Sequence, residues 1–420
     1  MDDPAFETEV DTTTQSILLH AAQHDLAALK PFLRTPGAAS VQDPETGLTP
    51  LHACIDSCGP KPAEESEDDA AEIEKAVAVM KELFFSGAIW NDLSADGETP
   101  GCVAWRLGRR DLYELCVEAG VRAEMLLNLM GGYEELSSAG DEDEEDMEIV
   151  EGEEVNGQEV TGEESIEIIN GTTDGKDEEQ KTESGATKKD VNSADYLASN
   201  LTFTDSKLVD ADSNGVMMAW ETSIMERSVA TLLPPPENTG KRILNIGFGM
   251  GIIDNLFAAT SPSSHHIIEA HPAVLAKLHD PTSPLSQITQ SPAVTVHAGR
   301  WQDICPVLLE SGEVFDAIYF DTFGEDYAQL KLFFTEFVVG LLDPAGRFGF
   351  FNGLGADRRV CYDVYTRVVE MDLLDAGFEC EWENVDVPAL GEEKEGEWEG
   401  VRRRYWTLET YRLPVCTFLG

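Results

Sequence analysis

The sequence predicts an α/β domain built on a mainly parallel sheet, preceded by a smaller α-helical repeat region. Three observations lead to this prediction. Short apolar runs alternate with helix-like segments after residue 193, a TPLHAC box lies at residues 49–54, and a strongly acidic stretch separates the two parts. We therefore expect three segments, with boundaries at 1–130, 131–192 and 193–420.

The N-terminal segment has a spacing typical of stacked helical repeats. His20 and His52 lie 32 residues apart, and the ankyrin period is about 33 residues. Thr49 to Ala53 reproduce the TPLHxA box of such repeats, and a second ETP lies at Glu98 to Pro100. This pattern predicts ankyrin-like repeats whose two histidines stabilise turns. The alternative is an unrelated helical domain with one chance box.

The charge of the chain limits its partners. The formal net charge is -51, and residues 134–183 alone hold 21 acidic residues against two lysines, which predicts a disordered acidic linker. Binding to nucleic acid or to an anionic membrane needs clustered Lys and Arg, so a basic protein or a cationic small molecule is the expected partner. The eight cysteines form no CxxC pair, and neither a signal peptide nor a membrane span is evident. We expect a soluble protein of the cytoplasm and nucleus.

The segment after the linker alternates strands and helices. Such alternation predicts a mainly parallel sheet with helices on both faces, and a ligand beyond the carboxyl ends of the strands. The expected strands are 242–246, 266–270, 293–297, 315–320, 347–352, 378–387 and 404–412. The expected helices are 252–260, 272–279, 328–342 and 359–376.

Residues 242–255, RILNIGFGMGIIDN, place a glycine-rich loop directly after a predicted strand. Gly247, Gly249 and Gly251 permit a sharp turn and a close approach of the backbone to a ligand. Glu269 ends the next strand, 22 residues after Gly247, where a carboxylate can accept both hydroxyls of a ribose. Nicotinamide enzymes and S-adenosylmethionine methyltransferases share this arrangement. The form GFGMG favours S-adenosylmethionine, and a purely structural strand-to-helix turn is the alternative.

Three further side chains are candidates for a site at the same edge of the sheet. Trp301, with Asp303, follows the third strand, where it would either stack on an adenine or belong to the core. Asp321 ends the fourth strand in FDAIYFDTFGEDY, where catalytic groups collect in open α/β folds, although an aspartate there can also cap a helix. Glu221, in MMAWETSIM, is either a second site carboxylate or an ordinary helix acid.

The motifs occur in the order WET, ILNIGFGMG, IIEA, GRW, YFDTF and FFN, which resembles the guanidinoacetate methyltransferase branch of the seven-strand, Rossmann-like S-adenosylmethionine-dependent methyltransferases. With the N-terminal region, the acidic linker and FFNGLGADRR added, the chain closely resembles the fungal type IV protein arginine N5-methyltransferases. The resemblance implies that Glu221 and Asp321 are catalytic and grip a guanidinium group. It also suggests that Asn352 lines the acceptor pocket, the alternative being a turn role. The cofactor contacts that it implies are Gly247, Phe248, Gly249, Met250, Gly251, Glu269, Ala270, Asp321 and, in addition, Met225, Trp301 and Thr322.

The resemblance implies transfer of a methyl group from S-adenosylmethionine to the internal N5 nitrogen of an arginine in a basic protein, the expected acceptor class being a large-subunit ribosomal protein. We expect a monomer without a metal. A small-molecule guanidine methyltransferase is one alternative, which the extra 130 residues disfavour. A non-catalytic repeat protein or acidic chaperone is another, and the intact Glu221, Glu269 and Asp321 argue against it.

Overall fold

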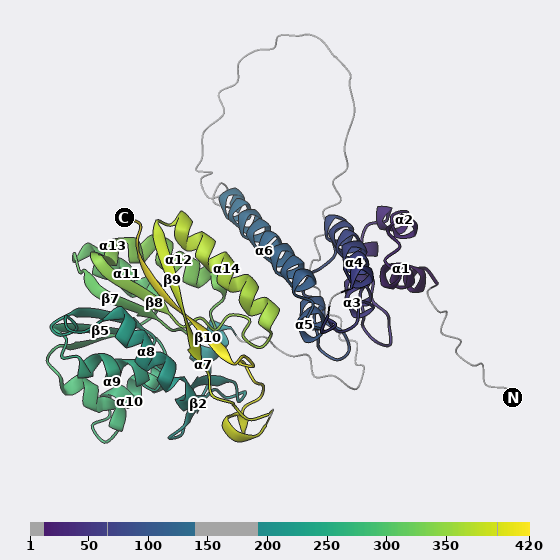
Figure 1. Ribbon diagram of the computed structural model, residues 1–420. Coiled ribbons are helices and arrows are strands. Elements are labelled where there is room, and N and C mark those ends of the chain that lie inside the picture. Colours follow the sequence, from purple (N-terminus) through teal and green to yellow (C-terminus); the bar gives the residue numbers. More distant parts are fainter. Residues whose placement is uncertain (1–11, 65, 139–191, 393) are drawn as a thin grey trace, which may run out of the picture. The chain divides into compact units, whose positions relative to one another are not determined.

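The computed structural model describes residues 12–64, 66–138, 192–392 and 394–420 (Figure 1). The predicted acidic linker, 131–192, lies almost entirely outside the described residues. The helical region before it and the α/β domain after it belong to one compact unit. Within the described ranges, no helix is both long and apolar enough to cross a membrane.

The N-terminal region is helical, as predicted. It contains α1 Thr12–Ala22, α2 Leu26–Leu29, α3 Pro50–Asp56, α4 Glu67–Phe85, α5 Pro100–Arg106 and α6 Arg110–Ser138. The last of these helices continues beyond the expected boundary at residue 130. The assignment of this region to the ankyrin class stays a prediction.

Two of these helices begin with the same Thr-Pro pair. Thr49 and Thr99 are N-cap residues, and their hydroxyl oxygens accept hydrogen bonds from the backbone N–H groups of His52 and Cys102 at 3.4 and 3.2 Å. The His52 ring accepts a hydrogen bond from the backbone N–H of Thr49 at 3.2 Å, and its other nitrogen lies 2.9 Å from the carbonyl oxygen of Glu98. His52 therefore joins two successive turns, which confirms its predicted turn-stabilising role.

The α/β domain is built on a sheet with the strand order β6-β5-β4-β7-β8-β10-β9. The first five strands in this order pair in parallel, and β10 runs antiparallel to both β8 and β9. The predicted, mainly parallel sheet is thus confirmed. Its strands are β4 Arg242–Ile246, β5 Ser264–Glu269, β6 Val294–Ala298, β7 Phe315–Phe320, β8 Leu342–Phe350, β9 Phe378–Asp386 and β10 Thr410–Phe418.

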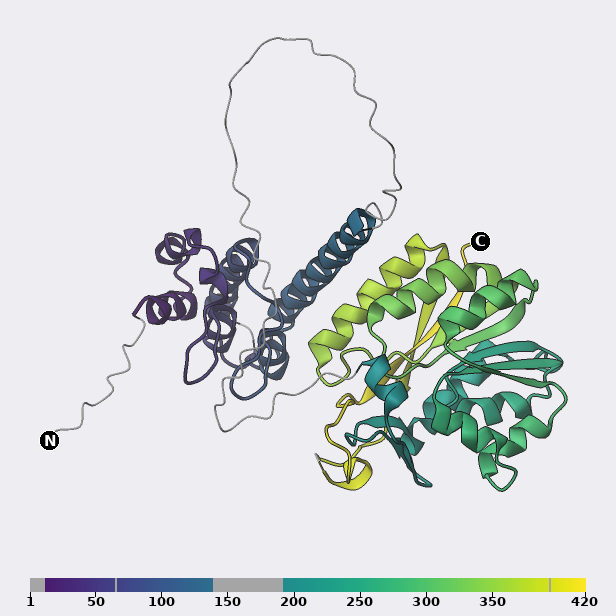
Figure 2. The same ribbon diagram turned by 180° about the vertical axis from the view of Figure 1, so that it is seen from behind.

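Helices cover both faces of this sheet (Figures 1 and 2). One face carries α8 Thr222–Leu232, α9 Ile252–Ala259 and α10 Pro272–His279, and the other carries α11 Trp301–Glu310 and α14 Arg359–Asp375. In β7, Ala317 and Tyr319 pack on the first side, while Ile318 and Phe320 pack on the second. Burial on both faces explains why this strand is a continuous apolar run.

Some predicted boundaries were wrong. The last strand was placed at 404–412 but begins at Thr410, because Trp406 and Leu408 are buried in a separate aromatic cluster and not in the sheet. The predicted helix 328–342 is broken into α12 Tyr327–Leu332, a π-helical turn Phe333–Val338 and α13 Val339–Leu341. The sequence reasoning also missed α11, which begins at Trp301.

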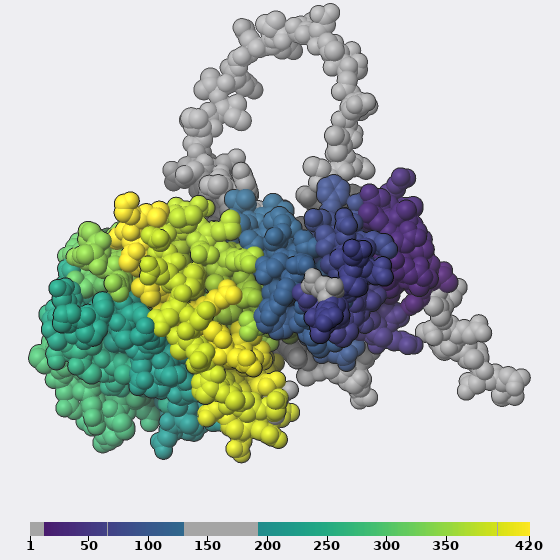
Figure 3. Space-filling view, in the orientation of Figure 1, coloured from purple at the N-terminus to yellow at the C-terminus, as the bar shows by residue number. Residues whose placement is uncertain are grey.

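A small antiparallel sheet lies beside the main one. It contains β1 Thr202–Phe203, β2 Lys207–Val209 and β3 Gly215–Met218. Residues 387–409, which connect β9 to β10, pack against it through Trp398 and Trp406, which share a buried cluster with Met218 and Trp220. This connection is the yellow lobe at the lower edge of Figure 3.

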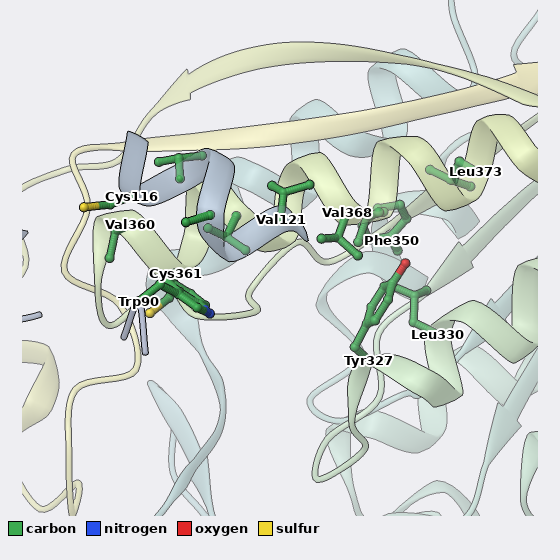
Figure 4. Close-up of a cluster of buried hydrophobic side chains, with 14 of the residues drawn as sticks. Trp90, Cys116, Val121, Tyr327, Leu330, Phe350, Val360, Cys361, Val368 and Leu373 are labelled. Carbon is green, nitrogen blue, oxygen red and sulfur yellow. The ribbon is translucent and has the colours of Figure 1, made fainter. Parts of the chain in front are cut away.

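One apolar core continues from the helical region into the α/β domain. Trp90, Cys116 and Val121 of the helical region belong to the same cluster of buried side chains as Val360 and Val368 of α14 (Figure 4). The two regions that the sequence predicted as separate domains therefore share a core along α14.

Candidate active site

A hollow of about 620 Å³ lies at the carboxyl ends of the parallel strands, where the sequence predicted the ligand. Short helix α7, Ser193–Ala198, contributes part of its wall. The predicted site residues on the wall are Gly247, Gly249, Glu269, Ala270, Trp301, Asp321 and Thr322.

Gly247 occupies a position that only glycine fits. Its φ of 91° is in the left-handed region, and a Cβ added there would lie 2.0 Å from the carbonyl oxygen of Asp321. The backbone around it is held on both sides, since Gly247 N–H donates to Ile268 and Asp321 N–H donates to Ile246, each at 2.9 Å. The loop after β4 and the end of β7 are therefore in direct backbone contact.

The rest of the glycine loop contributes in different ways. Gly249 lies on the wall, and an added Cβ would meet the Met217 sulfur at 2.9 Å. Phe248 is buried, and its ring packs where a Cβ on Gly251 would fall, so its side chain faces away from the hollow. The backbone N–H of Met250 donates to the Met217 sulfur at 3.2 Å. Phe248, Met250 and Gly251 shape the loop without lining the hollow.

Glu269 is buried and binds the glycine loop itself. Its Oε2 accepts hydrogen bonds from the N–H groups of Phe248 at 3.0 Å and Gly249 at 3.4 Å, and its Oε1 accepts from the N–H of His271 at 2.6 Å. Burial raises the pKa of Glu269, and these backbone donors oppose that rise. Glu269 thus stabilises the loop as well as lining the hollow, a role that sequence reasoning did not predict.

Trp301 belongs both to the core and to the wall. Its ring meets those of Phe320 and Phe333 edge-to-face at 5.8 and 5.3 Å, and only 3% of the residue is exposed. Its indole N–H donates to the Glu325 carboxylate, at 3.0 and 3.1 Å from the two oxygens. Asp303, two residues further along α11, is exposed and does not line the hollow.

Asp321 stands at the centre of the candidate site. It follows β7 directly, and together with Thr322 it lines both the first hollow and a second one of about 480 Å³. Burial raises the pKa of the Asp321 carboxyl to about 7, and the charge of Asp254 contributes to the rise. The position at a strand end was predicted, whereas the second hollow was not.

Glu221 lines neither of these two hollows but is electrostatically coupled to Asp321. It is 4% exposed and ends a single 3₁₀ turn, Ala219–Glu221, ahead of α8. Burial raises its pKa to about 8, with a further contribution from the charge of Asp321. The Tyr405 hydroxyl donates to Oε1, and the N–H of Met218 donates to Oε2 at 3.4 Å. The charge of Asp321 therefore favours the neutral form of Glu221.

Two predicted residues lie away from both hollows. Asn352 is 1% exposed, and its amide nitrogen donates to the Tyr362 and Thr366 hydroxyls at 3.1 and 3.3 Å. Met225, which belongs to α8, is fully buried in the core. Met217, which belongs to β3, is the methionine on the wall of the first hollow.

Sequence reasoning missed the aromatic residues that complete the site. Tyr196 of α7 lines the first hollow, with its ring 4.7 Å from that of His271 and 4.9 Å from that of Phe323. The histidine in EAHP was the available signal, because His271 is buried and its Nε2 lies 3.0 Å from the Tyr196 carbonyl oxygen. Tyr405 comes from the long connection before β10, where no local pattern indicates a site residue.

A family model described as guanidinoacetate N-methyltransferase matches residues 185–389. Curated relatives extend the match over nearly the whole chain. Protein arginine N-methyltransferase 2 of Neurospora crassa is 55% identical over 418 residues, which are 97% of this chain and 96% of that protein. The Gibberella zeae protein of that name is 52% identical over 94% of this chain and 90% of that protein. The Yarrowia lipolytica protein is 39% identical over 89% of this chain and 84% of that protein.

The chain therefore belongs to the protein arginine N-methyltransferase 2 family. Members of this family are arginine methyltransferases that depend on S-adenosylmethionine. Among solved structures, an O-methyltransferase from Streptomyces achromogenes is similar at 18% identity and a TM-score of 0.33, covering 49% of this chain and 82% of that one. Spermidine synthase from Thermotoga maritima is similar at 12% identity and a TM-score of 0.36, covering 53% of this chain and 72% of that one. Scores this low add nothing to the assignment, which rests on the sequence relatives.

Proposed function

We propose that this arginine methyltransferase modifies the internal N5 nitrogen of an arginine in a basic protein, with a large-subunit ribosomal protein as the acceptor. The observation that carries the proposal is the buried Asp321 carboxyl group, which lines both hollows and whose charge contributes to the raised pKa of the buried Glu221 carboxyl group. Two neighbouring buried carboxylates are costly to ionise, and a guanidinium group bound beside them offsets that cost.

The first hollow suits S-adenosylmethionine. Gly247 and Gly249 bring backbone without a side chain to the wall, and the Glu269, Asp321 and Glu325 carboxyl groups on the wall suit a cationic ligand. When bound, S-adenosylmethionine supplies a methyl group attached to a positively charged sulfur. On this proposal Glu269 and Trp301 hold the nucleoside part.

The second hollow suits an arginine side chain. It shares Asp321, Thr322 and Glu325 with the first hollow, and Phe351 and Leu354 give it an apolar wall. An arginine side chain combines an apolar stem with a cationic head, so such a lining matches both of its parts. The arrangement supports an acceptor arginine that reaches Asp321 through the second hollow.

The carboxyl groups have two tasks in this proposal. A guanidinium keeps its proton throughout the physiological pH range, and its delocalised electrons make it a poor nucleophile. Asp321 binds its N–H groups, fixes the internal nitrogen and accepts the proton that this nitrogen loses as the C–N bond forms. Glu221, held by Tyr405 and Met218, adds negative charge that favours binding of the cation.

The site of methylation is tested by mass spectrometry. The protein, S-adenosylmethionine labelled in the methyl group and a cell lysate are incubated, and the protein and metabolite fractions are hydrolysed separately. We expect label in the protein fraction, on arginine whose fragments carry the methyl group on the internal nitrogen. Label confined to a terminal nitrogen contradicts the N5 assignment. The family model is named after a guanidinoacetate enzyme, so label confined to the metabolite fraction favours a small-molecule acceptor.

Glu269→Ala should weaken binding of S-adenosylmethionine by about 10- to 100-fold, because the variant loses a wall carboxylate and the acceptor for three backbone N–H groups. Isothermal titration calorimetry measures the affinity. Glu313→Ala, a carboxylate beyond the end of α11 that does not line the hollow, is the matched control. Equal affinity of Glu269→Ala and the control removes Glu269 from the cofactor site.

The activity should rise with pH as the two carboxyl groups ionise. Since their pKa values are raised to about 7 and 8, the acidic limb of kcat/KM is expected between about pH 6 and 8. The Tyr405 hydroxyl favours the ionised form of Glu221, so Tyr405→Phe should move this limb to higher pH, by roughly one unit. A pH profile identical to that of the wild type would show that the Tyr405 contact does not tune the site.

A further inference from the structure

Helix α14 is packed against the helical region at very short range. A Cβ on Gly101 would lie 2.6 Å from Cγ2 of Val360, and a Cβ on Gly120 would lie 2.6 Å from Cγ2 of Val364. These two glycines, in α5 and α6, let their helices approach α14 more closely than any side chain would allow. A displacement of the helical region therefore displaces α14.

A buried polar contact crosses this apolar surface. The hydroxyl of Tyr113, in α6, donates to Oδ2 of Asp363 in α14. The other carboxylate oxygen of Asp363 lies 2.9 Å from Nη2 of Arg412 in β10. Tyr113 is 2% exposed and Asp363 is 6% exposed, so water does not compete for these groups. Asp363 thus joins the helical region to the strand that borders β8.

The same two elements hold Asn352, which follows β8. The Asn352 amide nitrogen donates to the hydroxyl of Tyr362, the residue before Asp363, at 3.1 Å and to the carbonyl oxygen of Arg412 at 3.2 Å. The backbone N–H of Arg412 in turn donates to the Tyr362 hydroxyl at 2.8 Å. The backbone N–H of Asn352 donates to the hydroxyl of Tyr411 at 2.9 Å.

This end of β8 borders the candidate site. The charges of Asp321 and Glu221 both contribute to the raised pKa of the buried Tyr411 hydroxyl. Residue Phe351, beside Asn352, lines the second hollow. The polar contacts from Tyr113 onward therefore end at the wall of the hollow that we assign to the acceptor arginine.

We propose that Tyr113 and Asp363 are positioning residues, through which the N-terminal helical region holds Asn352 and the acceptor side of the active site. The inference rests on the proposed function, because it takes the second hollow to be the arginine site. It assigns the helical region a part in catalysis in addition to any recruitment of the acceptor protein. Neither residue lines either hollow, but the contacts they make lead to Asn352, which lies next to Phe351 on the wall of the second hollow, so we expect the effect on the acceptor.

The test compares two single substitutions on adjacent residues of α6 in the full chain. Tyr113→Phe removes only the hydroxyl that binds Asp363. Glu114→Gln is the matched control, because Glu114 forms an exposed ion pair with Arg367 of α14 at 2.8 Å that involves neither Asp363 nor Arg412. Both variants lose one polar contact between the same pair of helices.

We expect Tyr113→Phe to lower kcat/KM for total large-subunit ribosomal protein by roughly tenfold, mainly through a higher apparent KM, while the Kd for S-adenosylmethionine stays at the wild-type value. Glu114→Gln should match the wild type in both quantities. The assays are made well below the unfolding temperature of each variant. Asp363→Asn, the second variant, should reproduce the raised KM.

Equal kinetic constants for Tyr113→Phe and Glu114→Gln, with any difference limited to the unfolding temperature, overturn the inference and leave the proposed function intact. An equal loss of cofactor affinity and acceptor affinity in Tyr113→Phe also overturns it, because a general loosening of the fold would produce that result. The proposed function fails separately, if Asp321→Asn methylates the same acceptor at the wild-type rate.

Discussion

Replacing Asp321 by asparagine should lower kcat by about 10² to 10⁴, while S-adenosylmethionine still binds with nearly unchanged affinity. The substitution preserves the shape of the side chain at the end of β7 but removes the proton acceptor and a negative charge that binds the guanidinium. Single-turnover kinetics with labelled S-adenosylmethionine measure the methyl-transfer step, and calorimetry measures cofactor binding.

Asp303→Asn is the matched control, because it makes the same chemical change on the exposed side of α11. Asp321→Asn should also be more stable than the wild type near pH 8. The folded protein binds a proton at Asp321 that the unfolded chain has released, so the stability of the wild type falls as pH rises from about 4 to 7. The stability difference should close towards pH 4. A wild-type rate in Asp321→Asn removes Asp321 from the chemistry.

Gly247→Ala should lower the free energy of unfolding by more than about 3 kcal/mol. Because the substitution displaces the glycine loop, it should also abolish cofactor binding. Alanine at this position would need a left-handed φ. Its methyl group would lie 2.0 Å from the carbonyl oxygen of Asp321. The backbone at Gly247 and at Asp321 is hydrogen-bonded to neighbouring strands, so neither segment can move without breaking these hydrogen bonds. Urea unfolding followed by far-UV circular dichroism measures the loss.

Gly312→Ala separates the two causes. Gly312 has a similar φ of 73°, but an added Cβ would meet nothing within 4 Å. The free energy of unfolding of the control should therefore fall only by the cost of the left-handed conformation, about 1 kcal/mol. Equal losses in the two variants would show that the collision with Asp321 is relieved by a small movement.

The parallel sheet and the candidate cofactor edge were predictable from local sequence. The run ending at Ile246 and the glycines after it have one favourable arrangement, a buried strand followed by a sharp turn, and Glu269 ends the next strand at the same edge. The two Thr-Pro pairs that predicted the repeats lie at the starts of α3 and α5. Such features depend on residues close together in the chain, so their signals survive without a structure.

Residues that act through distant contacts were not predictable in this way. Tyr405 binds Glu221 across 184 positions, and Tyr113 binds Asp363 across 250. No periodicity or motif connects such pairs, because their proximity results from the packing of whole helices and strands.

The sequence by itself determined the order of strands and helices, the glycine loop and the acidic residues at the strand ends. The tertiary structure alone decided that Glu269 binds the loop, that Glu221 is buried, and that the helical region shares a core with α14. The physical reason is that burial and charge coupling depend on every neighbour in space, whereas turns and strand ends depend on the chain's own neighbours.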